Sequence, residues 1–158
     1  MKTGIFHRYS EYLDRYVQVG TAGDKVVSVS FPETPDEDSI QDDLEVLDSI
    51  FEYIDGEEVD LSEYDVGLTV GGIERSALLR TRDIPRGTTI TYEELAESIG
   101  ADEDDYEDVR EALVSNPVPV LLPCHRVVEE SGIGDYTGET SIKRRLLEVE
   151  DVHQSPIN

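Results

Sequence analysis

The spacing of apolar side chains changes along the chain, and this change most constrains the possible folds. In the first part, short runs at residues 3–9, 15–20 and 25–31 have the β-branched and aromatic content of strands. A short connection containing a glycine separates the last two runs, as in a β-hairpin. In the second part, apolar residues recur every three or four positions, which is typical of amphipathic helices. We therefore predict an α+β protein with an N-terminal α+β domain over residues 1–70 and a helical C-terminal domain over residues 71–158.

Start and stop signals bound the predicted helices. Helices are expected over residues 36–54, 73–82, 92–99 and 104–115, with a short strand over residues 66–70. Thr91 and Glu94 form a capping-box pattern, in which each side chain bonds the main-chain amide of the other residue. The last two helices follow each other across a short turn, which makes them a candidate helix-turn-helix, although many helical hairpins share this pattern.

Acidic residues greatly outnumber basic ones. The chain has 37 Asp and Glu against 13 Lys and Arg, a formal net charge of −24. Residues 1–66 hold 18 acidic and 4 basic side chains, and residues 67–158 hold 19 and 9, so the acid is not confined to a tail. This spread is typical of a solvated surface adapted to high salt, which predicts a halophilic protein. A surface that repels nucleic acid is the alternative.

The sequence also bears on compartment and metal binding. It has no run of about 20 apolar residues to span a membrane, and its start has no apolar stretch of signal-peptide length. Its one cysteine, Cys124, can form neither an internal disulfide nor a multi-cysteine zinc site. We expect a cytoplasmic monomer without membrane contact, metal or cofactor. His7 and His153 lie outside any motif and are expected at the surface.

The stretch 116–128 contains most of the residues that could carry chemistry. The prolines after Asn116 predict an extended chain, and Cys124 then stands between a proline and His125. A thiol is mostly protonated at neutral pH, so a cysteine nucleophile needs a base or a positive charge beside it. His125 and Arg126 are candidates for both. The alternative is that Cys124 only fills space in the core.

Four segments together resemble the O6-alkylguanine-DNA alkyltransferases, also called methylated-DNA–protein-cysteine methyltransferases. These segments lie at residues 84–96, 116–128, 132–138 and 143–150. The resemblance covers residues 76–150, and Pro-Cys-His-Arg-Val at its centre is a specific signature of the family. It implies a small N-terminal ribonuclease-H-like α/β domain and a C-terminal winged-helix-like domain with a helix-turn-helix.

The resemblance also implies a set of residue roles. Cys124 would accept the alkyl group irreversibly, so that each molecule acts once. His125 would draw the thiol proton through a water, and Glu150 would orient the imidazole, as in a catalytic triad. Asn116 would be the hinge that connects the helix-turn-helix to the cysteine segment.

Further residues would handle the substrate, which is double-stranded DNA containing O6-alkylguanine. Because the alkyl carbon is hidden in the stacked duplex, the nucleotide must be rotated outward. Tyr92 would help this rotation and offer its hydroxyl to the base. The main chain near Val127 and Thr137 would contact the guanine edge, and Tyr136 would form a wall of the pocket.

The sequence departs from the family pattern on the predicted recognition helix. Glu107 stands where the family has the arginine that fills the gap left by the extruded base, and Arg110 stands where it has a small residue. Glu139 replaces a glycine of the loop over the pocket. We hypothesise that Arg110 takes over the gap-filling contact, and that high salt screens the surrounding acidic residues from the phosphates.

A rival interpretation is a lesion-binding sensor of the alkyltransferase-like kind, which binds alkylated bases without accepting the group. Such proteins usually lack the cysteine, so Cys124 argues against this alternative. The change at Glu107 argues for altered contact with DNA.

Overall fold

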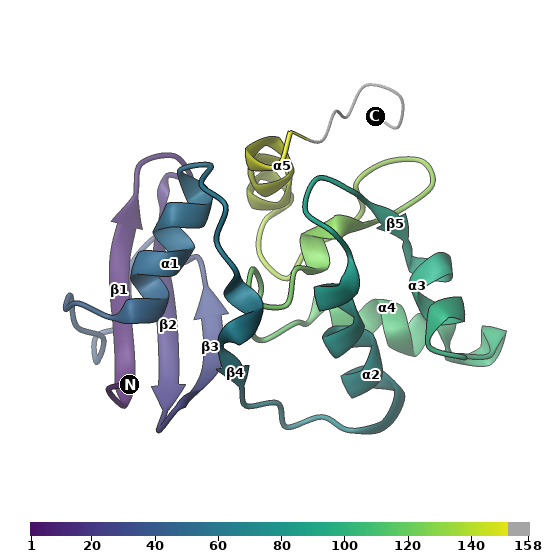
Figure 1. Cartoon of the computed structure of the whole chain (residues 1–158), viewed down its shortest axis with the longest axis horizontal. Coiled ribbons are helices and arrows are strands. Elements are labelled where there is room, and N and C mark those ends of the chain that lie inside the picture. The colour runs from purple at the N-terminus through teal and green to yellow at the C-terminus, as the bar shows by residue number, and fades with distance from the viewer. Residues whose placement is uncertain (152–158) are drawn as a thin grey trace.

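The computed structural model describes residues 1–151 (Figure 1). Its strands are β1 (Gly4–Ser10), β2 (Arg15–Ala22), β3 (Lys25–Ser30), β4 (Asp65–Val66), β5 (Ile90–Thr91) and β6 (Val127–Val128). Its α-helices are α1 (Glu45–Ile54), α2 (Gly72–Arg80), α3 (Tyr92–Ser98), α4 (Tyr106–Val114) and α5 (Thr140–Val149). Short 3-10 turns are η1 (Leu61–Glu63), η2 (Thr81–Asp83), η3 (Glu103–Asp105) and η4 (Cys124–Arg126).

The N-terminal part is a four-stranded sheet with α1 across one face (Figure 1). The order is β1-β2-β3-β4; the first three strands are antiparallel and β4 runs parallel to β3. Gly23 adopts a positive φ of 63° in the turn between β2 and β3, a conformation that glycine reaches without steric cost. The three predicted strands and their hairpin are therefore confirmed, whereas the strand expected over 66–70 is reduced to Asp65–Val66.

The helix predicted over residues 36–54 is wrong in its first half, because α1 begins only at Glu45. Ile40 instead bonds to strand β1: its amide donates to Ile5 O at 2.9 Å, and its carbonyl accepts from His7 N at 3.0 Å. A free sheet edge thus takes the main-chain groups that a helix would have paired. The side chain of Ile40 is half exposed, so its place in the helical spacing did not reflect burial.

The C-terminal part is helical, with α2 packed against α4 and α3 against both (Figure 1). The capping box is confirmed at the start of α3, where Glu94 N donates to Thr91 Oγ1 at 3.1 Å and Thr91 N to Glu94 Oε1 at 3.0 Å. Strand β5 pairs in parallel with β6 through Ile90–Val127 and Thr91–Val128. This pairing places the start of α3 beside the cysteine segment.

The chain between Asn116 and Cys124 turns back on itself, so the extended conformation predicted there is wrong. Leu122 N donates to Val118 O at 3.0 Å, and Val120 adopts a positive φ of 75°. The prolines fix φ locally, but this main-chain bond reverses the chain direction.

One hydrophobic core runs through both parts of the molecule. Helix α5 lies between the sheet and the C-terminal helices (Figure 1), and Tyr12 in the N-terminal part donates its hydroxyl to Arg145 O at 2.9 Å. Within residues 1–151, no helix is both long and apolar enough to cross a membrane.

Candidate active site

Cys124 is the first residue of η4 and is 3% exposed. Burial raises the pKa of its thiol to about 11, although the Asn116 side chain and the Lys143 ammonium act in the opposite direction. The thiol is therefore protonated at neutral pH. It can act as a nucleophile only if a nearby base removes the proton.

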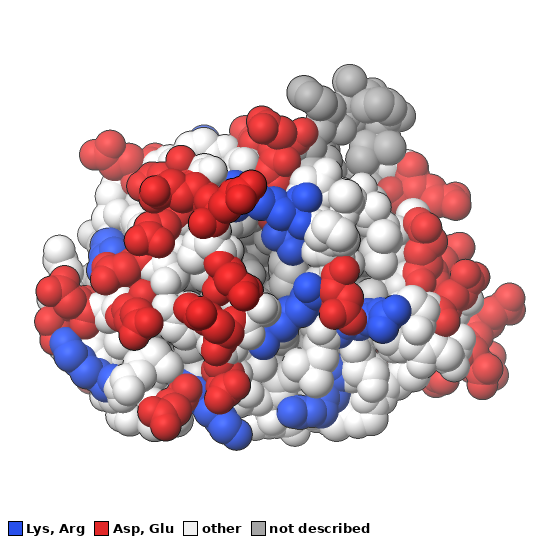
Figure 2. Space-filling view, in the orientation of Figure 1, with Lys and Arg blue, Asp and Glu red and all other residues white. Residues whose placement is uncertain are grey.

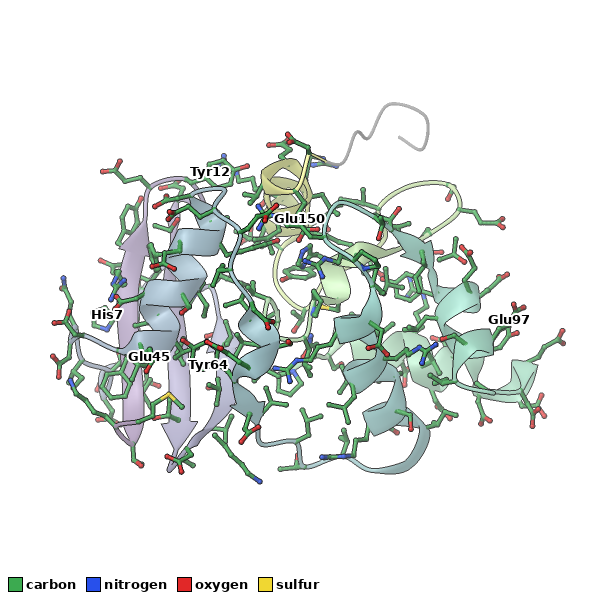
Figure 3. The ribbon with its side chains drawn as sticks, viewed as in Figure 1. His7, Tyr12, Glu45, Tyr64, Glu97 and Glu150 are labelled. Atoms are coloured by element: carbon green, nitrogen blue, oxygen red, sulfur yellow. The ribbon has the colours of Figure 1, made fainter. Side chains whose placement is uncertain are left out.

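A buried imidazole–carboxylate pair lies at the next residue. His125 Nε2 is 2.6 Å from Glu150 Oε2, and both side chains are buried. Arg126 donates to the same carboxylate through Nε at 2.9 Å and Nη2 at 3.0 Å, and Gly87 N donates at 3.0 Å. Glu150 is the residue that caps the C-terminus of α5, and Figure 3 shows it between the two parts of the molecule.

The pKa values of this pair suit a neutral base beside a charged acid. Burial is the largest effect on His125 and lowers the pKa of its imidazole, with Glu150 opposing it. Burial would raise the pKa of the Glu150 carboxyl, but its bonds to His125, Arg126 and Gly87 outweigh burial and hold that pKa well below its usual range. The imidazole is therefore neutral and able to accept a proton near pH 7.

The N-terminal part adds one side chain that the sequence did not single out. Tyr53, on the last turn of α1, is 2% exposed. Its hydroxyl lies 3.0 Å from His125 Nε2 and donates to Glu150 Oε2. No local motif marks this tyrosine, because its partners lie more than 70 positions away in the sequence.

Asn116 holds the turn that precedes the cysteine. Its Nδ2 donates to Leu122 O at 2.8 Å, and its Oδ1 accepts from Val118 N at 2.9 Å. The buried side chain thus bonds main-chain groups on both arms of the turn, which sets where η4 begins. Its carbonyl also accepts from Thr137 Oγ1 at 2.8 Å.

A fully buried ammonium lies on the other side of the cysteine segment. Lys143 Nζ donates to Val127 O at 2.8 Å and Asp135 O at 2.9 Å, and lies 3.4 Å from the Tyr92 hydroxyl. Burial lowers the pKa of this ammonium to about 8, while the Cys124 side chain opposes that change. In the sequence, Lys143 belongs to the segment 143–150 that resembles the alkyltransferase family, but the sequence alone assigns it no role.

Arg110 is engaged on the outer side of Tyr92. Its guanidinium bonds Glu129 Oε1 at 2.7 Å and Asp135 Oδ2 at 3.1 Å, and lies 5.3 Å from the centre of the Tyr92 ring. Glu107, one turn earlier on α4, is exposed. A groove of about 400 Å³ lies between the start of α3, helix α4 and residues 128–131, and Tyr92, Glu107 and Arg110 line it.

The remaining predicted site residues also lie around this segment. Tyr136 is buried and stacks against Phe31 of the N-terminal part at 6.4 Å between ring centres. Val127 is buried in β6, and Thr137 is partly buried beside Asn116. Within residues 1–151, no cluster of three His, Cys, Asp or Glu side chains could hold a metal ion.

Two histidines expected at the surface have different outcomes. His7 is partly buried, and its Nδ1 lies 2.8 Å from Ser39 Oγ. His153 lies outside the described residues.

The site is thus that of a thiol-nucleophile protein, with a buried sulfur, an adjacent imidazole and a carboxylate on the far ring nitrogen. The sequence profile "6-O-methylguanine DNA methyltransferase, DNA binding domain" matches residues 73–152. The chain therefore belongs to the 6-O-methylguanine DNA methyltransferase family, which confirms the resemblance found in the sequence.

Individual proteins of known name or structure are similar to this chain over nearly its whole length. The methylated-DNA–protein-cysteine methyltransferase of Metallosphaera sedula is 27% identical over 147 residues, which are 90% of this chain and 92% of that protein. The crystal structure of the Mycobacterium tuberculosis O6-methylguanine methyltransferase is similar with a TM-score of 0.78 and 25% identity, over 93% of this chain and 92% of that one. The same organism's OGT in complex with DNA is similar with a TM-score of 0.73 and 25% identity, over 92% and 91%.

Proposed function

We propose that this protein repairs DNA by moving a methyl or other small alkyl group from guanine O6 to Cys124. A bond forms between the sulfur and the alkyl carbon, and the bond from that carbon to O6 breaks with its electron pair left on the guanine. The thiol proton leaves through His125, and a proton returns to the guanine. The thioether has no easy reverse reaction, so each molecule acts once.

The contact between His125 Nε2 and Glu150 is the observation that carries this proposal. It uses the far side of the ring and leaves Nδ1 as the basic nitrogen. Among the described residues, His125 Nδ1 and Tyr136 Oη are the buried side-chain polar atoms without a hydrogen-bond partner. Such atoms require a partner in a working site, and one water between Nδ1 and the Cys124 thiol would supply it and carry the proton.

Charge around the sulfur supports the same step. The thiol pKa of about 11 means that the resting protein holds the proton, and the neutral imidazole can take it. The Lys143 ammonium lowers the thiol pKa, because a positive charge favours the thiolate. Burial of the whole set strengthens these interactions relative to water.

On the substrate side, we propose that double-stranded DNA containing O6-alkylguanine docks on α3 and α4 as a helix-turn-helix. Tyr92 begins the capped helix α3 and borders the groove, which suits a role in rotating the nucleotide outward. The main chain at Val127 and Thr137 would contact the guanine edge, with Tyr136 as a wall. The Val127 carbonyl already accepts from Lys143, which leaves one lone pair for a base.

Arg110 remains our candidate for the contact that fills the gap in the duplex. Its bonds to Glu129 and Asp135 would have to exchange for contacts to DNA. Figure 2 shows acidic side chains gathered over α3 and the start of α4, at the right of the view. At about 1 M salt the screening length is near 3 Å, so both the internal pairs and the repulsion of phosphates would weaken. This fits a halophilic protein.

Finer features of the architecture belong to the same proposal. A ribonuclease-H-like N-terminal domain is supported by the antiparallel β1–β3 with parallel β4 and one covering helix. A winged-helix-like C-terminal domain is supported by α3 and α4 with the β5–β6 pair. We place the boundary between residues 70 and 71, between β4 and α2, and we expect a cytoplasmic monomer.

The test is an intact-mass measurement after incubation with duplex DNA bearing O6-methylguanine in concentrated KCl. We expect a mass increase equal to one CH2 group, located on Cys124, with no more than one group per molecule. Cys124→Ser must remove the adduct and retain the fold. Tight lesion binding without an adduct would overturn the proposal in favour of a lesion-binding sensor.

A further inference from the structure

One residue of the N-terminal part bonds directly to the imidazole–carboxylate pair of the C-terminal part. The Tyr53 hydroxyl is 3.0 Å from His125 Nε2 and donates to Glu150 Oε2, and His125 Nε2 is 2.6 Å from that same oxygen. Three polar atoms from α1, η4 and the end of α5 therefore meet at one point. All three side chains are buried.

The positions of two hydrogens, that of the Tyr53 hydroxyl and that of the His125 ring, follow from these contacts. A carboxylate oxygen only accepts, and a phenol carries one hydrogen. Tyr53 gives its hydrogen to Glu150, so its oxygen can face Nε2 only as an acceptor. His125 must then carry its hydrogen on Nε2, and the lone pair of the neutral ring lies on Nδ1.

The charged and titratable groups that face His125 come from several elements. Glu150 lies at the end of α5, Arg126 beside His125 in η4, and Lys143 on α5. Arg86 lies over the Tyr53 ring at 5.1 Å from its centre. Burial first, and then the negative charge of Glu150, raises the pKa of the Tyr53 hydroxyl well above its usual value, so it stays a neutral donor.

We propose that Tyr53 is a positioning residue for the transfer reaction: it keeps the His125 hydrogen on Nε2 and reduces the pull of Glu150 on that hydrogen. The N-terminal domain thereby contributes an atom to the proton-transfer network of the C-terminal domain. This inference rests on the proposed function for its kinetic consequence, but its effect on His125 can be measured without DNA.

The consequence of losing the hydroxyl has a definite sign. In Tyr53→Phe, Glu150 loses a donor, so its charge is less dispersed and stabilises the protonated imidazole more strongly. The pKa of His125 should rise by about half a pH unit or more, which is within the range of one hydrogen bond to a charged group. Because the more basic ring stays protonated to a higher pH, the acid limb of the rate profile should move up by the same amount, and transfer at a given pH on that limb should slow by about threefold.

A matched control is available on the same side of the molecule. The Tyr64 hydroxyl shares a hydrogen bond of 2.7 Å with Ser49 Oγ. Figure 3 shows Tyr64 beside Glu45 and away from Glu150. Tyr64→Phe removes a hydroxyl from the N-terminal part without touching His125. It should leave both the transfer rate and the His125 titration unchanged.

The test combines single-turnover rates against pH with NMR titration of the histidine ring nitrogens in the full chain. Only three histidines are present, so the His125 signals can be assigned with His7→Gln and His153→Gln. An upward shift of the His125 midpoint in Tyr53→Phe alone, with the matching shift of the acid limb of the rate profile, supports the proposal.

Two results would overturn it. One is a His125 midpoint that is the same in Tyr53→Phe, Tyr64→Phe and the unmodified protein. The other is an unmodified protein whose neutral His125 carries its hydrogen on Nδ1, which decides the matter even if Tyr53→Phe does not fold. Failure of alkyl transfer in the unmodified protein would refute the proposed function instead, and the titration would still test Tyr53.

Discussion

Replacing Lys143 by Met should remove a specific dependence of stability on pH. The folded protein lowers the pKa of this lysine from 10.5 to about 8, because the ammonium is buried. Between these two values the unfolded chain still holds the proton that the folded protein has released. The free energy of unfolding must therefore rise as the pH increases through this window. A lowering of this size corresponds to about 3 kcal/mol.

At pH 7 the same substitution has two opposing effects. Loss of the buried charge removes the desolvation cost of about 3 kcal/mol. The carbonyls of Val127 and Asp135, however, lose the donor that now lies within 2.9 Å of each. A buried acceptor without a partner costs about 1–3 kcal/mol. The net change at pH 7 is thus small or moderately destabilising, and the pH dependence is the diagnostic quantity.

The assay is urea unfolding at a series of pH values, with both proteins carrying Cys124→Ser. That background is needed because the Cys124 thiol pKa is raised from 9.0 to about 11, so its contribution to stability falls as the pH increases through the same range. Relative to the Lys143→Met variant, the free energy of unfolding of the protein that retains Lys143 should increase by about 3 kcal/mol between pH 8 and 10.5. The exposed Lys25→Met serves as the control and should show no such difference. Parallel curves for the lysine and Lys143→Met proteins would refute the account of a buried, destabilised ammonium.

Three further substitutions test other parts of the site. Glu150→Gln leaves the Arg126 guanidinium without its carboxylate, so we expect a loss of about 3–5 kcal/mol in stability and transfer slowed more than tenfold. The low pKa of the Glu150 carboxyl stabilises the fold at pH values above the ordinary value of 4.5, and this stabilisation is lost on acidification. The stability of the variant should therefore depend less on acid pH in urea titrations. Asn116→Ala removes two buried bonds to the main chain, and calorimetry should show a loss of about 2–5 kcal/mol. Gly134→Ala places a Cβ at a positive φ of 76° and 3.2 Å from the Tyr92 ring, so we expect a loss of about 1–2 kcal/mol in stability together with slower transfer; an unchanged rate would mean that the loop does not set the ring position.

Local patterns predicted the elements whose causes are local. The hairpin around Gly23 and the capped start of α3 need only neighbouring residues, and both are confirmed. The helix expected over 36–54 fails where a distant partner intervenes, because Ile40 pairs with strand β1. The extended conformation expected after Asn116 fails for a similar reason, since a main-chain bond from Leu122 to Val118 closes a turn that proline content alone does not reveal.

The same distinction applies to the candidate site. Its central residues lie in one conspicuous stretch, and the family resemblance added Glu150 from 25 positions further on. The structure brings this carboxylate to His125. Tyr53 could not be found this way, because its contacts with His125 and Glu150 form only when α1 packs against the C-terminal part. The hypothesis that Arg110 fills the gap in the duplex came from its place in the sequence alone. Its ion pairs with Glu129 and Asp135 depend on the geometry of the loop after β6, which the sequence does not reveal.

The depth at which the sulfur lies has a consequence for the idle protein. A molecule that works once must keep its acceptor thiol intact before it meets damaged DNA. Peroxides and soluble disulfides react mainly with cysteines that are exposed and ionised to the thiolate. With 3% of Cys124 reachable by solvent and a thiol pKa of about 11, little thiolate is ever offered to such reagents. If the proposed function holds, burial therefore protects the thiol from oxidation until an extruded alkylated base places its alkyl carbon next to the sulfur.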